Sequence, residues 1–305
     1  MPDKIILKKK ILSFHKKISI PGDKSISIRW VLVSSLANGI SKAKNLLMSD
    51  DVLASIKAVK KLGAKVIIYK NECKIHGVGT KGYKYKKNLV INAQNSGTLG
   101  RLISGILIDT PYPIKIIGDK SLSNRDFRRI AVPLSKFGAS FTLRNNHYLP
   151  LTINGSKKLK PIKFLENKGS AQCKSSVIFG GMKADGKTII KAKKSRNHTE
   201  LLFKHLKLPI KVKKNKKFDL IEIKKTNNIK PINYKVPSDI SSGSFFIALT
   251  VLSKNSQIII KNINVNPSRI GIVAILKKMG VKIVLLNKRT YKGETIADIF
   301  VKSPK

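Results

Sequence analysis

Two sequence marks recur along this chain with nearly the same period. The first is a glycine or its substitute between an amphipathic helix pattern and a strand pattern, with spacings of 75, 70 and 72 residues, at Gly63, Gly138, Leu208 and Gly280. The second is a serine-bearing helix start that opens an apolar run, with spacings of 71, 74 and 71 residues, at Ser25, Ser96, Ser170 and Ser241. Two independent marks with one period indicate four copies of one supersecondary unit.

Each copy reads as strand, helix, strand, helix and then a pair of strands. In the segment DVLASIKAVKKLG, apolar residues such as Ile56 and Val59 recur at helical spacing, and the β-branched segment after Gly63 is typical of a strand. Glycine just past a helix is a common C-terminal cap, and Pro209 is expected to end the helix of the third copy. The pattern predicts an α/β (α+β) fold of repeated βαβαββ units, with helices covering one face of each sheet.

The charge of the chain is strongly unbalanced. Its 305 residues include 62 Lys or Arg and 16 Asp or Glu, which gives a net charge of +46 and favours anionic partners. Only nine of the basic residues are arginine, and the abundance of Lys, Ile and Asn is typical of an A- and T-rich coding bias. Because the arginine fork grips carboxylate or phosphate with two parallel hydrogen bonds, the few arginines are the more informative cations.

The helix starts combine these arginines with groups suited to anions. A helix N-terminus presents unpaired N–H groups and the positive end of the helix dipole, so it can hold a phosphate. In PGDKSISIR, Lys24 and Ser25 lie at the helix start, and Arg29 follows one turn later on the same face. NSGTLGR repeats the design with Gly97, which allows close approach to the backbone, and Arg101. The sequence therefore predicts anion-binding helix tips.

Acidic residues near other helix starts are predicted to be caps. Asp239 lies in PSDISS, where an N-cap is expected, and Asp50 and Asp51 are expected to cap a helix that begins at Val52. We therefore predict no catalytic carboxylate among them.

Eight segments, in this order, carry a family resemblance. They are IPGDKSISIRWVLVSSLANG, NLLMSDD, NAQNSGTLGRLISGIL, GDKSLSNRDFRRIAVPLSKFGA, GSAQCKSSVIFGGMKADG, SRNHTELL, VPSDISSGSFFIALTVL and NVNPSRIGIVAILKKMG. From about residue 18 to about residue 283 the chain resembles the 3-phosphoshikimate 1-carboxyvinyltransferases, also called 5-enolpyruvylshikimate-3-phosphate synthases. The resemblance implies a transferase of chorismate and aromatic amino acid biosynthesis that needs no cofactor. It would move the enolpyruvyl group of phosphoenolpyruvate to the 5-hydroxyl of shikimate 3-phosphate and release phosphate.

The resemblance also implies the site residues. Lys24 matches a position that touches both substrates, while Gly97 and Arg125 match phosphoenolpyruvate ligands. The remaining matches are contacts of shikimate 3-phosphate, with Gln172 reaching phosphoenolpyruvate as well: Ser25, Arg29, Ser170, Ala171, Gln172 and the phosphate contact Ser195. Ala171 can offer only its backbone.

The resemblance further implies two similar domains of three units each. Residues 21 to 235 would form one complete domain, and residues 1 to 20 with 236 to 305 would form one unit of the second domain. By the period found here, two units of roughly 120 to 145 residues in all are expected after Lys305. In the family that stretch supplies the catalytic carboxylates, so no catalytic acid or base is predicted within the chain.

Other readings stay open at this point. One is a catalytically inactive partial chain that still binds shikimate 3-phosphate. A second is the related UDP-N-acetylglucosamine enolpyruvyl transferase, although its reactive cysteine has no clear counterpart here. A third is a basic nucleic-acid-binding protein, which the scattered lysines and sparse aromatic residues disfavour.

The remaining features predict a soluble protein. Cys73 and Cys173 lie 100 residues apart without metal-ligand spacing, so neither a zinc site nor a disulfide framework is indicated. The apolar runs are too short for a membrane span. We expect a cytoplasmic monomer whose partners are the two small-molecule substrates, with no nucleic acid, membrane or metal.

Overall fold

The computed structural model describes residues 11–70 and 72–304. The chain divides into two compact units. One is Gly22–Val236, and the other joins the segment that ends at Pro21 to the segment that begins at Pro237. Both units are built from four-stranded sheets with one topology, and each unit is described by itself.

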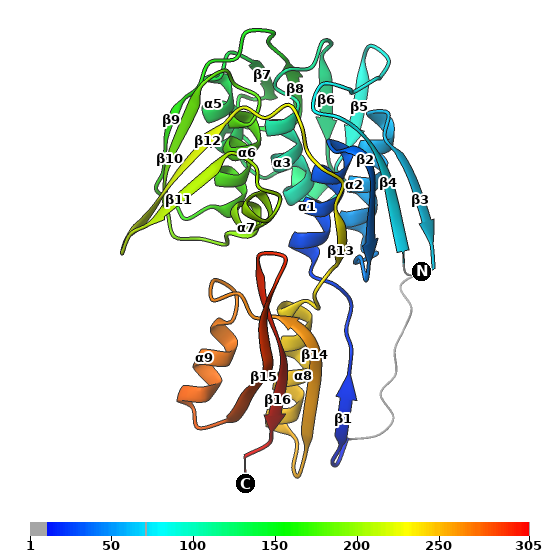
Figure 1. Ribbon diagram of the computed structural model, residues 1–305, viewed down its shortest axis with the longest axis vertical. Helices are drawn as coiled ribbons and strands as arrows, with labels where there is room; N and C mark the ends of the chain where they lie inside the picture. Colours follow the sequence, from blue (N-terminus) through cyan, green and yellow to red (C-terminus); the bar gives the residue numbers. More distant parts are fainter. Residues whose placement is uncertain (1–10, 71, 305) are drawn as a thin grey trace. The chain divides into compact units, whose positions relative to one another are not determined.

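All described sheets share the strand order first, second, fourth, third. The first two strands are parallel, and the last two form an antiparallel hairpin whose final strand pairs with the second. Within Gly22–Val236 the three sheets are β13-β2-β4-β3, β5-β6-β8-β7 and β9-β10-β12-β11 (Figure 1). The predicted βαβαββ repeat is therefore confirmed.

The elements of Gly22–Val236 follow the three copies. The first copy contains α1 (Lys24–Ser35), β2 (Asn38–Lys44), α2 (Asp50–Lys61), β3 (Lys65–Tyr69) and β4 (Glu72–Val78). The second contains β5 (Leu89–Asn92), α3 (Gly97–Ile106), β6 (Ile114–Ile117), α4 (Lys120–Ser123), α5 (Arg128–Ser135), β7 (Ser140–Arg144) and β8 (Tyr148–Asn154). The third contains β9 (Lys163–Glu166), α6 (Ala171–Gly181), β10 (Lys187–Lys193), α7 (His198–His205), β11 (Ile210–Lys214) and β12 (Phe218–Lys224), and β13 (Asn233–Lys235) follows it.

The second unit contains one copy. Its elements are β1 (His15–Ile18), α8 (Ile240–Leu252), β14 (Gln257–Asn264), α9 (Gly271–Lys278), β15 (Lys282–Tyr291) and β16 (Glu294–Lys302), and its sheet is β1-β14-β16-β15. A core of aliphatic residues such as Ile260 and Ile299 lies between this sheet and its helices. Phe245 and Leu252 of α8 are 79% and 85% exposed.

The first strands of two sheets are exchanged along the chain. β1 directly precedes α1 of the Gly22–Val236 unit in sequence, yet it pairs in parallel with β14, in the unit that contains α8. β13 directly precedes α8, yet it pairs in parallel with β2, with Tyr234 opposite Ala43. The Gly22–Val236 unit is thus closed by its own last strand, which supplies the sheet position missing from its first copy.

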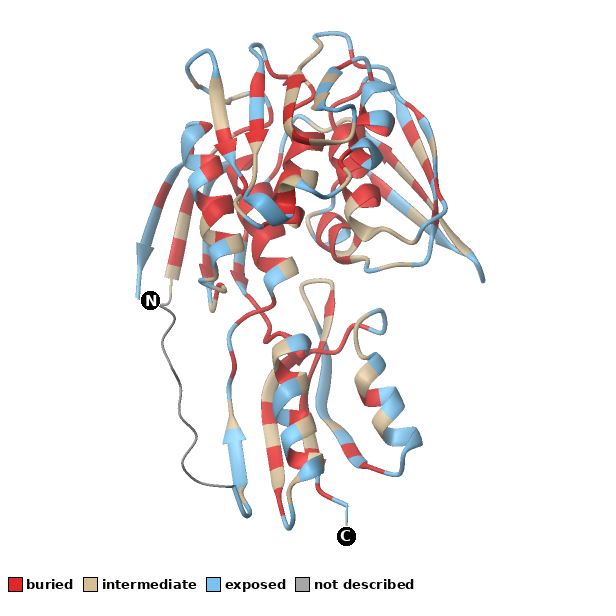
Figure 2. Cartoon of the chain, turned by 180° about the vertical axis from the view of Figure 1, so that it is seen from behind, coloured by how far each residue is buried: buried red, intermediate tan, exposed pale blue. Residues whose placement is uncertain are grey.

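The first helix of each copy forms the core of the Gly22–Val236 unit. In α1 every residue from Ile26 to Ser35 is buried, and α6 is buried from Cys173 to Gly181 (Figure 2). A side chain at Gly105 of α3 would place its Cβ 2.1 Å from the carbonyl oxygen of Ser176. Only glycine permits this close approach of α3 to α6.

Two details of the repeat differ from the sequence prediction. α2 begins at Asp50, with Ser49 as N-cap, so Asp50 and Asp51 lie in its first turn rather than before it. The two carboxylates there still interact favourably with the positive end of the helix dipole. In the third copy the left-handed residue that ends the second helix is Lys207, with φ 55°, one residue before the predicted Leu208. Gly63, Gly138 and Gly280 all have positive φ, as a C-terminal cap requires.

No helix among the described residues combines the length and the apolar character that crossing a bilayer requires. Both cysteines are free and buried. Burial raises the pKa of the Cys73 thiol to about 11, because desolvation disfavours the thiolate, and the charge of Lys60 offsets only part of this.

Asp298 in β16 lies beside two register shifts, one in each of its neighbouring strand pairs. The two pairs are β14 with β16 and β15 with β16. Its carboxylate accepts from the Asn262 backbone N–H at 2.8 Å, from the Asn287 amide at 2.9 Å, and from Lys261. Burial by itself would raise the pKa of Asp298, but these hydrogen bonds outweigh it and the pKa is lowered.

The lowered pKa of Asp298 predicts how the free energy of unfolding depends on pH. The carboxylate stabilises the fold at pH values above the unfolded pKa of about 3.9, and this contribution is lost as the pH falls toward the lower folded pKa. Asp298→Asn should reduce the free energy of unfolding at pH 7 by about 1–3 kcal/mol. Urea unfolding between pH 7 and pH 3 should show a smaller loss of stability on acidification for the variant. Equal slopes for both proteins would contradict this role.

Candidate functional site

Three helix starts of the Gly22–Val236 unit carry the predicted residues. α1 begins at Lys24, and its N-cap Asp23 accepts from the Ile26 N–H at 3.0 Å. The other two tips are capped by serine, because Ser96 accepts from the Leu99 N–H and Ser170 from the Cys173 N–H, each at 3.3 Å. Gly97 and Ala171 are therefore the first residues of α3 and α6. Such ends keep further N–H groups for an anion.

α3 and α6 run side by side in the same direction. Arg101 meets Gln172 near the helix starts, the Ser176 hydroxyl donates to the Arg101 carbonyl at 2.9 Å, and Asp109 meets Lys183 just past the helix ends. α1 joins them, since Arg29 donates to Ser175 of α6. Parallel helices bring their positive dipole ends to one side. This end of the unit therefore carries a concentrated positive potential.

Arg29 is buried in this end, with an exposed fraction of 3%. Its Nε donates to the Thr199 hydroxyl at 2.7 Å, its Nη1 to the Ser25 carbonyl at 2.9 Å, and its Nη2 to the Ser175 hydroxyl at 3.1 Å. The predicted pair of Ser25 and Arg29 is thus in direct contact, one turn apart on α1.

Arg101 links the second and third copies. Its Nη1 donates to the Gln172 side-chain oxygen at 2.6 Å, and the Gln172 amide donates to the Thr98 hydroxyl at 3.0 Å. The guanidinium lies over the Phe127 ring, 5.1 Å from its centre. Burial lowers the pKa of Arg101, and the nearby Arg129 and Arg125 add to the effect. Gln172 is therefore held in one orientation at the tip of α6.

Arg125 lies beside the start of α3 and is exposed. A Cβ at Gly97 would lie 3.0 Å from Nη1 of Arg101 and 3.3 Å from Nη1 of Arg125. Arg125 Nη2 donates to the Asn95 side-chain oxygen at 3.2 Å, and Asn95 donates to Asp119 at 2.6 Å. Gly97, Gln172 and the two arginines thus share one end of the unit.

Two other predicted residues, Lys24 and Ser195, make their described contacts away from the three arginines. Lys24 is exposed, and its ammonium group lies 3.4 Å from the Asp51 carboxylate at the start of α2. Ser195 precedes α7, and its hydroxyl is covered, with no hydrogen-bond partner among the residues that the structure describes. For these two, the described contacts include no direct bond to Arg29, Arg101 or Arg125.

A buried ion pair supports the tip of α6. Lys174 Nζ lies 2.7 Å from the Glu200 carboxylate, and the two side chains are 0% and 3% exposed. Within residues 11–70 and 72–304, neither Lys174 Nζ nor the Glu200 oxygens make a hydrogen bond of good geometry. The pair is thus isolated in the interior, where an unmatched charge would be costly.

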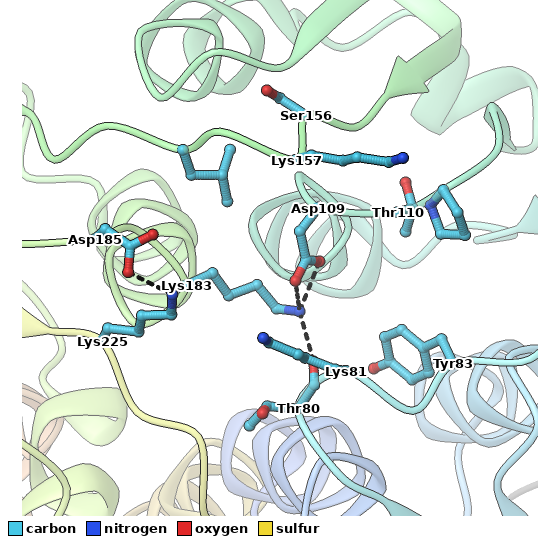
Figure 3. A pocket seen from close by; sticks show the side chains of 12 residues that line it. Thr80, Lys81, Tyr83, Asp109, Thr110, Ser156, Lys157, Lys183, Asp185 and Lys225 are labelled. Atoms are coloured by element: carbon cyan, nitrogen blue, oxygen red, sulfur yellow. Dashed lines mark hydrogen bonds and ion pairs between the residues drawn. The ribbon is translucent and has the colours of Figure 1, made fainter.

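At the C-terminal end of α3 and α6, one lysine, Lys183, contacts residues from all three copies. Lys183 follows α6, and its ammonium group lies 2.7 Å from both Asp109 oxygens and 2.9 Å from the Thr80 carbonyl oxygen (Figure 3). These three residues come from the third, second and first copies. They line a cavity of about 350 Å³, together with Lys81, Tyr83, Thr110, Pro111, Ser156, Lys157, Leu159, Asp185 and Lys225. Burial lowers the pKa of Lys183, and Asp109 opposes the shift.

Sequence reasoning missed several of these residues. Thr199, Ser175, Lys174 and Glu200 were not predicted, because each acts through a contact between helices far apart in sequence. The serine- and glycine-bearing helix starts and the scarcity of arginine were the two signals that pointed into this region. Of the nine arginines, Arg29, Arg101 and Arg125 lie here.

The fourth helix start, in the other unit, follows the same design. Asp239 caps α8 by accepting from the Ser241 N–H at 2.7 Å, which confirms its predicted capping role. Arg269 Nη2 donates to Asp239 at 3.1 Å and to the Ser241 hydroxyl at 2.8 Å. An arginine thus accompanies this tip too.

Comparison with known proteins identifies the family. The family model described as EPSP synthase (3-phosphoshikimate 1-carboxyvinyltransferase) matches residues 8–302. The 3-phosphoshikimate 1-carboxyvinyltransferase of Caldicellulosiruptor bescii is 40% identical over 291 residues, which cover 95% of this chain and 66% of that protein. The protein of the same name from Petrotoga mobilis is 37% identical over 294 residues, covering 95% and 67%.

A solved structure agrees with these sequence matches. The EPSP synthase of Acinetobacter baumannii superposes with a TM-score of 0.87 at 34% identity, covering 95% of this chain and 65% of that one. The chain thus spans about two thirds of the length of these relatives. With its repeated βαβαββ copies and its arginine-lined helix tips, the chain belongs to the EPSP synthase family.

Proposed function

We propose that this chain takes part in the transfer of the enolpyruvyl group of phosphoenolpyruvate to the 5-hydroxyl of shikimate 3-phosphate, with release of phosphate. In this reaction the 5-oxygen forms a bond to the enolpyruvyl carbon, and the bond from that carbon to the phosphate oxygen breaks. The proton lost by the 5-hydroxyl is balanced by the one gained by the released phosphate. The observation that carries the proposal is the convergence of three helix N-termini with Arg29, Arg101 and Arg125 at one end of the Gly22–Val236 unit.

The substrates fit the chemistry of this end. Both are small polyanions that combine a phosphate with a carboxylate, and arginine forks and helix N-termini are the groups that hold such anions. In the proposal, Lys24, Ser25, Arg29, Ser170, Ala171, Gln172 and Ser195 bind shikimate 3-phosphate. Phosphoenolpyruvate lies against Gly97 and Arg125, within reach of Lys24 and Gln172.

The narrower alternative from the sequence is a chain that binds shikimate 3-phosphate without turning it over. Calorimetry with shikimate 3-phosphate and a phosphate-release assay with both substrates separate the cases. Binding with turnover supports the full proposal, and binding without turnover supports the narrower one. Absence of binding and of turnover would overturn both. The cytoplasmic location and the monomeric state remain predictions from sequence.

Arg125 gives a specific prediction for this site. Because it is exposed, Arg125→Met should change the free energy of unfolding by less than about 0.5 kcal/mol. Phosphoenolpyruvate affinity, measured by calorimetry with shikimate 3-phosphate present, should fall by about tenfold or more, because a charge-assisted fork is lost. Arg128→Met is the matched control, since Arg128 is also exposed and pairs only weakly with Asp126, 3.6 Å away. Equal losses in both variants would indicate a general charge effect.

A further inference from the structure

Arg29 is oriented by hydroxyl groups from the third copy. Thr199 at the start of α7 accepts from its Nε, and Ser175 on α6 accepts from its Nη2. The two hydroxyls are themselves hydrogen-bonded at 2.7 Å. A guanidinium is planar, so two acceptors on neighbouring nitrogens fix both its position and its plane.

The Thr199 hydroxyl is engaged by other protein groups. Thr199 is 1% exposed, and its hydroxyl already meets both Arg29 and Ser175. Its bond to Arg29 Nε, at 2.7 Å, is the shortest of the three described for this guanidinium. Any influence on a bound anion must therefore pass through Arg29.

The position of Thr199 is fixed by its neighbour. Glu200 pairs with Lys174, the residue before Ser175, so adjacent residues of α7 and α6 make an ion pair and a hydroxyl pair side by side. The ion pair holds the first turn of α7 against α6. This places the Thr199 and Ser175 hydroxyls within hydrogen-bond distance of Arg29.

We propose that Thr199 is a positioning residue that holds the Arg29 fork in the orientation needed to bind the phosphorylated substrate. The proposal rests on the function proposed above, in which Arg29 contacts shikimate 3-phosphate. Without the Thr199 hydroxyl, a buried Nε–H loses its acceptor, and the guanidinium turns to recover one.

The test uses Thr199→Val, which keeps the shape of the side chain and removes the acceptor. The first readout is the exchange rate of the Arg29 Nε proton with water, followed by nitrogen-15 NMR. It should rise at least tenfold in Thr199→Val and return to the wild-type value in Thr199→Ser. The second readout is shikimate 3-phosphate affinity by calorimetry, which should fall at least tenfold in the valine variant and recover in the serine variant.

Thr188→Val is the matched control. Thr188 is also fully buried, and its hydroxyl accepts from the Ile162 backbone N–H at 3.3 Å, away from Arg29. This variant should leave both readouts unchanged, even if it lowers the melting temperature. A comparable loss of affinity in Thr188→Val would show that the effect is structural and overturn the proposal.

Two further outcomes keep this inference separate from the proposed function. If Thr199→Val leaves the exchange rate of the Arg29 Nε proton unchanged, or speeds it without weakening the binding seen in wild type, the positioning role is wrong. If wild type itself binds no shikimate 3-phosphate, the proposed function fails and the ligand-binding part of this inference fails with it. The proton-exchange result then still decides whether Thr199 orients Arg29.

Discussion

Lys174→Met is expected to lower the free energy of unfolding by about 3–5 kcal/mol. Methionine fills most of the space of the lysine, but it leaves the Glu200 carboxylate buried, 3% exposed, without a compensating charge. For a unit of this size, the loss corresponds to a decrease in melting temperature of roughly 10 °C. Urea unfolding at pH 7 measures it directly.

The double variant Lys174→Met with Glu200→Leu separates charge from packing. Replacing both members of a buried ion pair by apolar residues is often neutral or stabilising, so the double variant should recover most of the loss. A double variant as unstable as Lys174→Met would assign the loss to packing. A single variant within about 0.5 kcal/mol of wild type, the range of ordinary surface substitutions, would contradict the account of the pair.

Lys183→Met is expected to lower the free energy of unfolding by about 3 kcal/mol, the lower end of the range for a broken buried pair. Asp109 keeps 27% of its side chain exposed, so water relieves part of its unmatched charge. The Thr80 carbonyl also loses its donor. Because these groups belong to the three copies, the variant should loosen the contact among them.

Hydrogen exchange locates the effect of Lys183→Met. Amides at the ends of α1, α3 and α6 should exchange faster together, because the ammonium group joins the three copies at this end. Lys225→Met is the control, since Lys225 lines the same cavity but pairs with Asp185, whose side chain is 71% exposed. Faster exchange confined to the turn after α6 would show that Lys183 does not join the copies.

The repeat was predictable from sequence because, in each copy, residues close together in the chain determine where the helices begin and end. The helix starts at Ser96 and Ser170 and the left-handed glycines at Gly63 and Gly138 are set by neighbouring residues, so their period reveals the four copies. In the third copy, the residue that ends the second helix was predicted one residue too late, because Lys207 adopts positive φ there without being glycine. The exchange of β1 and β13 between sheets is a long-range pairing that the local pattern does not encode, and only the family resemblance implied the domain boundaries beside these strands.

The site was predictable to the extent that it lies on the helix tips. Gly97 and Gln172 lie in the first turns of α3 and α6, where backbone N–H groups and the helix dipole favour anions, and Arg29 lies in the second turn of α1. The supporting contacts could not be read from sequence. Thr199 meets Arg29 across 170 residues, and Lys183 meets Asp109 across 74. In a chain with 62 basic residues, charge alone does not single out the lysines that are buried.

We infer that the tips of α1, α3 and α6 form one anion site for the two substrates. Titration of the nitrogen-15-labelled chain with shikimate 3-phosphate should shift the backbone amides at residues 24–26 and 171–173 together, with a single dissociation constant. Phosphoenolpyruvate added to that complex should then shift the amides at residues 97–99. Shifts confined to one helix, or spread over lysines throughout the chain, would contradict the claim.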